Sequence, residues 1–249
     1  MIEHTFVSGE RRRALYDSAV RFVLLALAAA LLVAPAAAAP GPAAPVWPAA
    51  GELVVPQVYV RREPDRSAPV LRVLAEFRRD YRPQVLLVLG DRVAAGGARW
   101  YRLSLPGRPN GQRGWAPAEA IQLRTLAHRI VVRRGARRLE VLRLGDGRVV
   151  FRAAVAIGMP SAPTPLGRNF YVRSRWAPPD PFYGPFALET SAYSSLTDWP
   201  GGGVVGIHGT SLPGLIGQAV SHGCVRMRND DVIRLRRLAP VGTPIDVLP

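Results

Sequence analysis

The 249-residue sequence contains a single cysteine, Cys224, and no lysine. One cysteine excludes an intramolecular disulfide and any metal site built on paired cysteines. The 33 basic residues are all arginines and outnumber the 18 acidic residues, giving a net charge of +15. We interpret the missing lysine as the codon bias of a GC-rich genome. Because the arginines are scattered and no nucleic-acid-binding motif accompanies them, we expect no nucleic-acid partner.

The chain is also poor in helix-forming segments. Its 24 glycines and 24 prolines interrupt most stretches long enough for a helix, which favours a β protein rich in turns and loops. A length of 249 residues corresponds to one large domain or two small ones. The sequence therefore predicts a mainly β fold with one or two short helices.

Residues 1–39 have the features of an export segment. Arg11, Arg12, Arg13 and Arg21 precede an apolar run, Phe22–Val33, which small residues follow. This order is typical of a cleaved secretory signal, but the uncharged stretch is long enough for a retained membrane anchor. In both cases we expect the rest of the chain outside the cytoplasm, secreted or anchored by one N-terminal segment. The Pro/Ala-rich stretch 40–51 is predicted to be a linker.

Residues 52–124 contain short β-like runs at a spacing typical of a small barrel. Val85–Leu89 is a candidate buried strand, and Trp100–Leu103 alternates in polarity before the turn Pro106–Gly111. With the following Gly114-Trp115-Ala116, this pattern resembles a bacterial SH3-like domain. The resemblance implies either a module that binds wall peptides or a packing module without a ligand.

Residues 127–249 read as a second β-rich unit. An Asp-Gly turn, Gly145-Asp146-Gly147, separates two β-like runs and predicts a hairpin. A helix is expected to begin with Asn229 as its N-cap, to bury Val232, Ile233, Leu235 and Leu238, and to end at Pro240. The predicted strands are His128–Val132, Leu139–Leu144, Arg148–Ile157 and Pro244–Leu248.

The residues that suggest chemistry lie between His208 and Arg226. Cys224 has two imidazoles near it in sequence, His208 and His222, and one cation, Arg226. An imidazole can accept the proton of a thiol, and nearby positive charge lowers the thiol pKa, so Cys224 is a candidate nucleophile. Amides near Gly223 and Cys224 are candidates for an oxyanion hole.

Two other interpretations of these residues remain open. A lone cysteine is commonly a small buried apolar residue. A zinc site of His208, His222 and Cys224 is conceivable, but His222 and Cys224 would face opposite ways on a regular strand. We expect no metal and no cofactor.

The run Ser221-His222-Gly223-Cys224-Val225-Arg226-Met227, preceded by His208-Gly209 and followed by Asn229, resembles the signature of the L,D-transpeptidase catalytic domain. Further matches follow the same order along the chain: Thr164–Phe170, Gly184–Ala187 and Gly206–Gly209. The resemblance covers about residues 127–249. It implies a β-rich catalytic sandwich that acts on the stem peptides of peptidoglycan, in cell wall biogenesis and the maintenance of cell shape.

The resemblance also implies roles for individual residues. Cys224 would attack the bond after the diamino acid of a tetrapeptide stem, release D-Ala and pass the acyl group to an amine of another stem, making a 3–3 cross-link. His208 would be the general base, oriented by the carbonyl of Gly209. His222, Ser221, Gly223 and Arg226 would line the substrate site, with Arg226 either supporting the loop or binding a substrate carboxylate. The family further implies acylation by carbapenems.

Alternatives to a transpeptidase remain open at this point. Water could resolve the thioester, making an L,D-carboxypeptidase or cysteine peptidase, or the chain could be a non-catalytic wall-binding protein. Leu166 stands where the family commonly has a small or polar residue, which leaves the substrate contacts there open. Trp176, Tyr183 and Tyr193 could border the groove, although packing is the expectation for each alone. The partners expected are stem peptides, anionic wall polymers and, if the segment is uncleaved, a membrane.

Overall fold

The computed structural model describes residues 45–198 and 200–249. The predicted export segment, 1–39, and the first part of the predicted linker lie outside the described residues. Pro45–Pro249 form one compact unit. Within the described part, no helix is long and apolar enough to cross a membrane.

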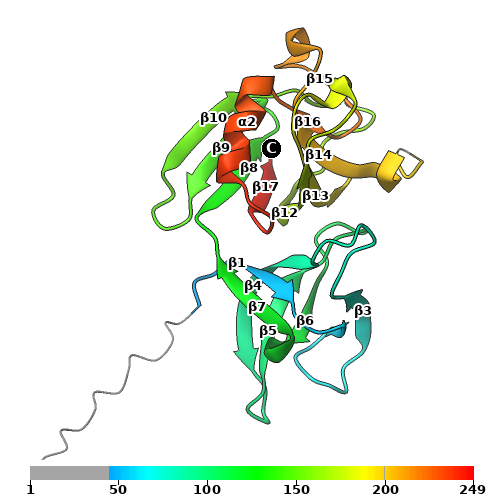
Figure 1. Cartoon of the computed structure of the whole chain (residues 1–249), viewed down its shortest axis with the longest axis vertical. Coiled ribbons are helices and arrows are strands. Elements are labelled where there is room, and N and C mark those ends of the chain that lie inside the picture. The colour runs from blue at the N-terminus through cyan, green and yellow to red at the C-terminus, as the bar shows by residue number, and fades with distance from the viewer. Residues whose placement is uncertain (1–44, 199) are drawn as a thin grey trace, which may run out of the picture. The chain divides into compact units, whose positions relative to one another are not determined.

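The first half of the described chain is a seven-stranded antiparallel sheet in the order β3-β2-β6-β5-β4-β1-β7 (Figure 1). Its strands and one 3₁₀ turn are β1 Ala49–Leu53, β2 Gln57–Arg61, β3 Val70–Ala75, β4 Val85–Val93, β5 Arg99–Ser104, β6 Arg113–Pro117, η1 Ala118–Ala120 and β7 Ile121–Thr125. The predicted buried strand is confirmed, because Val85 to Val88 are buried in β4. That this unit is SH3-like stays a prediction.

The first strand begins inside the segment that we expected to be a linker. Ala49, Ala50 and Gly51 belong to β1, which pairs with β4 on one side and β7 on the other. A Cβ at Gly51 would come within 2.6 Å of a Val88 methyl and 2.7 Å of an Ile121 methyl. The strand therefore needs small residues at this point, and small residues also gave the segment its linker-like composition.

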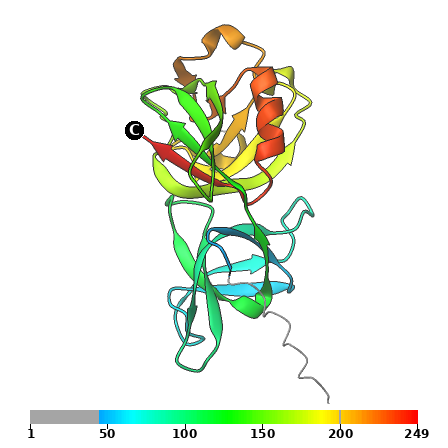
Figure 2. The same ribbon diagram turned by 90° about the vertical axis from the view of Figure 1, so that its left-hand side faces the viewer.

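The second half forms an eight-stranded mixed sheet in the order β10-β9-β8-β17-β12-β13-β14-β16, with β11 and β15 paired apart from it. Figures 1 and 2 show β1–β7 and β8–β17 as two separate groups of strands. The strands are β8 His128–Arg133, β9 Arg138–Arg143, β10 Val149–Ala154, β11 Ile157–Gly158, β12 Gly167–Trp176, β13 Ala187–Tyr193, β14 Val204–His208, β15 Ala219–Ser221, β16 Val225–Arg226 and β17 Pro244–Leu248. The 3₁₀ turns are η2 Pro181–Tyr183, η3 Pro200–Gly203 and η4 Pro213–Leu215.

One α-helix, α2 Asn229–Leu238, is present among the described residues, as the apolar pattern predicted (Figure 2). Val232 and Leu235 are fully buried in the core that the strands form, and Ile233 and Leu238 pack against its edge. The helix has acidic residues in its first turn and arginines in its last turn, and these charges stabilise it by complementing the helix dipole. The predicted cap was wrong: Arg228 occupies the N-cap position, and the Asn229 side chain is used elsewhere.

The predicted strand Arg148–Ile157 is divided in two. β10 ends at Ala154 and pairs with β9, while Ile157 starts β11, which runs parallel to β15. Val155 lies between them and donates its N–H to the carbonyl of Arg137. Most of β10 is exposed, whereas Ile157 and Gly158 of β11 are buried. The β-like run is nevertheless continuous in sequence, so its pattern does not reveal where the chain changes partner.

Tyr171 of β12 connects the two sheets. Its side chain is fully buried within the apolar core of the β1–β7 sheet, with Leu87, Leu103 and Leu105 among the members of that core. Its own strand belongs to the second sheet. The two β units therefore share a buried side chain, in addition to the polar contacts described below.

Candidate active site

Cys224 and His208 line one pocket of about 550 Å³. The lining comes from β12, β13, β14, the turns η2 and η3, the Cys224 loop and one residue of the first sheet's unit. Its members are Arg79, Arg173, Trp176, Tyr183, Ala187, Glu189, Tyr193, Gly201, Val204, Gly206, His208 and Cys224.

The Cys224 loop joins β15 to β16 and is held by its own polar groups. The Ser221 hydroxyl donates to the carbonyl of Cys224 at 2.6 Å and accepts the N–H of Gly223 at 3.2 Å. Gly223 has a φ of +116°, which L-residues rarely adopt. A Cβ there would also come within 3.1 Å of the Ser194 side chain. The loop thus presents a partly exposed Cys224 at a tight turn.

The thiol and the imidazole border the same small volume. The N–H of Gly206 points to Cys224 Sγ at 3.3 Å. A Cβ placed on Gly206 would lie 3.8 Å from Cys224 Sγ and 3.6 Å from His208 Cδ2. The side chains of Cys224 and His208 therefore lie on two sides of the space next to Gly206, although the two residues are sixteen positions apart in the sequence.

The orientation of His208 follows from its hydrogen bond. His208 ends β14, is 2% exposed, and its Nδ1 lies 2.6 Å from the carbonyl oxygen of Gly209. A carbonyl oxygen can only accept, so Nδ1 bears the proton and Nε2 keeps its lone pair. The Tyr183 ring packs edge-on against the imidazole, with the centroids 5.0 Å apart. The site thus holds a neutral imidazole with a basic nitrogen.

Burial decides the protonation of both groups. It lowers the pKa of His208 to about 4, an effect that the Gly209 carbonyl partly opposes and the Arg226 charge reinforces. Burial raises the pKa of the Cys224 thiol, and the Gly206 N–H and Arg226 oppose this with smaller effects. The expectation that nearby positive charge would give a low thiol pKa was therefore wrong in its net direction. The resting pair is a thiol beside a neutral imidazole.

This protonation state gives a pH dependence of stability. Between pH 6.5 and about 4 the unfolded chain binds a proton on His208 that the folded chain does not. Stability is therefore complete above pH 6.5 and falls as the pH is lowered, by a total of about 3 kcal/mol from this group. Urea unfolding of the wild type and of His208→Gln between pH 4 and 7.5 measures it. The variant should lose most of this slope, and an unchanged slope would contradict the assignment.

The other residues that we expected to line the substrate site, Ser221, His222, Gly223 and Arg226, make contacts with the protein itself. Arg226 is 7% exposed and its guanidinium stacks on the Phe182 ring, 4.7 Å from the centroid, which favours loop support over carboxylate binding. Ser221 is buried and bonded within the loop. The carbonyl of His222 accepts the Ser194 hydroxyl at 3.0 Å. The N–H of Gly223 is donated to the Ser221 hydroxyl within the loop at 3.2 Å.

Asn229 has a structural role that the sequence interpretation missed. Its Oδ1 accepts the N–H of Thr210 at 2.9 Å, next to the Gly209 carbonyl that orients His208. A Cβ on Gly184 or Gly209 would overlap this oxygen, so both positions need glycine. The helix start therefore fixes the end of β14. A side chain assigned to helix capping can equally accept a hydrogen bond from a distant strand, and local sequence does not distinguish the two.

Replacing Asn229 with alanine should destabilise the fold. The change leaves the N–H of buried Thr210 without an acceptor, at a cost of about 1–3 kcal/mol. Asn229→Asp is the matched control, because it keeps the accepting oxygen and adds a charge that suits a helix N-terminus. Chemical unfolding of both variants checks this. Equal stability of the alanine and aspartate variants would show that the hydrogen bond has no role.

The three aromatic residues that could border the groove all line the pocket: Trp176, Tyr183 and Tyr193. Lining the pocket does not exclude the packing that we expected for each alone, since the Tyr183 ring also packs against Phe182 and His208. Tyr193 is also bonded to Asn110 of the first β unit. Its N–H donates to Asn110 Oδ1 at 2.9 Å, and its carbonyl accepts from Asn110 Nδ2 at 2.7 Å. Leu166 is 44% exposed and is not among the lining residues.

A metal-based site was the remaining alternative for these side chains. Among the described residues, no group of three or more His, Cys, Asp and Glu side chains is placed to hold a metal ion.

Comparison with known proteins agrees with this arrangement. Residues 127–247 match the YkuD family, described as the L,D-transpeptidase catalytic domain. The YkuD protein of Bacillus subtilis, named as an L,D-transpeptidase, is 37% identical over 123 residues, covering 49% of this chain and 67% of the relative. Its counterpart in Bacillus licheniformis is 34% identical over 125 residues, covering 50% of this chain and 68% of the relative.

Solved structures of L,D-transpeptidases are more distant. The enzyme from Mycobacterium smegmatis matches with a TM-score of 0.39 and 16% identity, over 66% of this chain and 99% of that one. The catalytic domain from Enterococcus faecium matches with a TM-score of 0.37 and 24% identity, over 50% of this chain and 98% of that one. The family match and the two Bacillus relatives, both over 30% identical, decide the assignment. The chain belongs to the L,D-transpeptidase family.

Proposed function

We propose that the chain cross-links peptidoglycan, with Cys224 as the nucleophile and His208 as the general base. The observation that supports this most is the pairing of a thiol with a neutral imidazole whose Nδ1 is held by the Gly209 carbonyl, at a pocket of about 550 Å³. In this arrangement the carbonyl has the orienting role that a carboxylate has in other catalytic triads.

Acylation follows from the protonation state. As Cys224 Sγ attacks the carbonyl carbon after the diamino acid of a tetrapeptide stem, His208 Nε2 accepts the thiol proton. The imidazolium then gives this proton to the leaving nitrogen, the C–N bond breaks, and D-Ala departs. The stem remains as a thioester on Cys224. We assign the Cys224 N–H to the oxyanion, since the N–H of Gly223 is donated to Ser221.

Transfer reverses these steps with a second stem. An amine of the acceptor attacks the thioester carbon, His208 accepts the proton from the amine, and the imidazolium returns it to the leaving sulfur. A new amide, the 3–3 cross-link, forms and the thiol is restored. The high thiol pKa that burial causes keeps Cys224 protonated at rest and makes this return favourable.

The remaining site residues are assigned supporting roles. Ser221 and Gly223 shape the Cys224 loop, Arg226 supports it through Phe182, and His222 anchors it to Ser194. Trp176, Tyr183 and Tyr193 provide apolar walls for the stem. We propose action outside the cytoplasm, on wall peptides, by a protein that is secreted or anchored by its first residues.

Incubation of the full chain with purified tetrapeptide stems, followed by mass spectrometry of the products, tests the function. The proposal expects released D-Ala and a peptide dimer joined through the diamino acids. Release of D-Ala with tripeptide alone would instead indicate the carboxypeptidase alternative. Binding without any released D-Ala would indicate a wall-binding protein and overturn the proposal.

A further inference from the structure

The first β unit contributes one residue to the pocket. Arg79, from the segment between β3 and β4, lines the same pocket as Cys224 and His208, which belong to the second unit. This segment, 77–83, is a tight turn closed by the pairing of Phe77 with Pro83 and by the hydrogen bond from Arg78 N–H to the Arg82 carbonyl. We call it the 77–83 turn.

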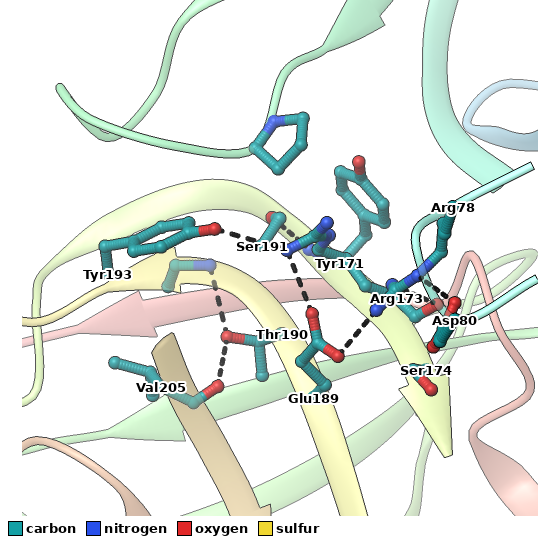
Figure 3. Close-up of polar contacts among 12 residues, drawn as sticks. Arg78, Asp80, Tyr171, Arg173, Ser174, Glu189, Thr190, Ser191, Tyr193 and Val205 are labelled. Carbon is teal, nitrogen blue, oxygen red and sulfur yellow. Dashed lines mark hydrogen bonds and ion pairs between the residues drawn. The ribbon is translucent and has the colours of Figure 1, made fainter. Parts of the chain in front are cut away.

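The 77–83 turn is fixed on β12 and β13 by the arginines on either side of Arg79. Arg78 Nη2 bonds Glu189 Oε2 at 2.8 Å and its Nη1 bonds the Arg173 carbonyl at 3.2 Å (Figure 3). Arg82 Nη1 bonds the Ser174 hydroxyl. Because Arg78 and Arg82 are both bonded to the second unit, the backbone of the 77–83 turn is fixed there and Arg79 is held at the pocket.

Arg79 differs from the arginines around it because it pairs with no carboxylate among residues 45–198 and 200–249. The Glu189 carboxylate pairs with two arginines (Figure 3). Its Oε2 contacts Arg78 Nη2, and its Oε1 lies 2.9 Å from Arg173 Nη1. Asp80 pairs with Arg78 and Arg82. Arg79 is exposed, and within the described part of the chain it has no ion pair. Of the two pocket arginines, Arg173 therefore has a carboxylate partner, and Arg79 is available to an anion.

We propose that Arg79 is a specificity-determining residue that binds a free side-chain carboxylate of the substrate peptide while Cys224 reacts with that peptide. A guanidinium can donate two parallel hydrogen bonds to a carboxylate, and a carboxamide offers only one acceptor and no charge. The inference rests on the proposed function, since it assigns the carboxylate to the stem peptide. It gives the first β unit a direct part in substrate selection, in addition to any binding of the wall.

The test compares two donor tetrapeptides, one with free side-chain carboxylates and one in which they are carboxamides. With the full-length wild type, kcat/KM for D-Ala release should be higher for the acid. Arg79→Gln should lower kcat/KM for the acid by about tenfold and leave the amide nearly unchanged. Arg79→Lys keeps the charge and should retain part of the preference. Arg62→Gln removes the same charge from the same unit outside the pocket, so its acid-to-amide ratio should equal that of the wild type.

The outcomes separate the two proposals. If the wild type releases D-Ala but Arg79→Gln has the wild-type acid-to-amide ratio, the role of Arg79 is refuted and the transpeptidase proposal stands. If the wild type releases D-Ala from neither peptide, the proposed function fails. In that case the dissociation constants of the two peptides for Cys224→Ala, with and without Arg79→Gln, decide the role of Arg79. Equal loss of acid and amide binding would refute it.

Discussion

Cys224→Ala is expected to remove all D-Ala release and cross-linking while the chain stays folded. The thiol is the only group assigned to form the covalent bond, so no slower route through another side chain should remain. The substitution removes only Sγ from a partly exposed turn residue, and its one hydrogen-bond partner, the Gly206 N–H, faces the pocket. D-Ala release and the urea unfolding midpoint, measured on the same sample, check both parts.

Cys224→Ser is the matched companion variant, because it keeps the size and the hydrogen bond but replaces the sulfur nucleophile. It should fold like the wild type and turn over far more slowly. Wild-type turnover by the alanine variant would remove the basis of the mechanism. Loss of activity together with loss of folding in both variants would mean that the residue is structural.

His208→Gln has the second-largest expected effect. It removes the imidazole that we propose as acceptor of the thiol proton, and a positioned general base contributes about 10²–10⁴-fold to rate. We expect kcat/KM for D-Ala release to fall by this factor. Because burial raises the pKa of the Cys224 thiol, little thiolate is present without the base, so activity of the variant should rise steeply with pH where the wild type is level.

His128→Gln is the control for this experiment. His128 lies in β8, and its Nδ1 also contacts a backbone carbonyl, that of Leu238, at 3.1 Å, but it does not line the pocket. Its replacement should leave kcat/KM and the pH profile unchanged. A His208 variant that resembled the His128 variant in rate and pH profile would contradict the base assignment.

The sequence was sufficient for the features that depend on local pattern. Turn signals and alternating polarity predicted the two β-rich units, and the apolar spacing from Val232 to Leu238 predicted α2. The resemblance brought His208 and Cys224 together as a pair. The hydrogen bond from His208 to the Gly209 carbonyl, which it also implied, is present in the structure.

The features that the sequence did not predict depend on contacts between distant segments. Arg79 is one of many arginines in the sequence, and only the anchoring of its neighbours on β12 and β13 brings it to the pocket. Tyr171 belongs to a strand of one sheet and is buried in the core of the other. Neither position can be predicted from the residues that lie next to Arg79 or Tyr171 in the sequence.

The thiol pKa shows a different limit of sequence reasoning. Proximity to Arg226 was predicted correctly and does lower the pKa, but the burial of Cys224 has a larger and opposite effect. Burial depends on how β14, the Cys224 loop and the aromatic walls pack, which charge counting along the chain does not include. In the mechanism that we propose, attack by Cys224 therefore depends on the His208 base more than on the charge of Arg226.

The covalent intermediate tests the central claim most directly. The full chain is mixed with a tetrapeptide donor whose side-chain amine is acetylated, so that the donor cannot act as acceptor. The reaction is quenched in acid and analysed by intact mass and peptide mapping. The mechanism requires one adduct with the mass of the tripeptide acyl group, located on the peptide that contains Cys224. Release of D-Ala with an adduct on any other residue would contradict it.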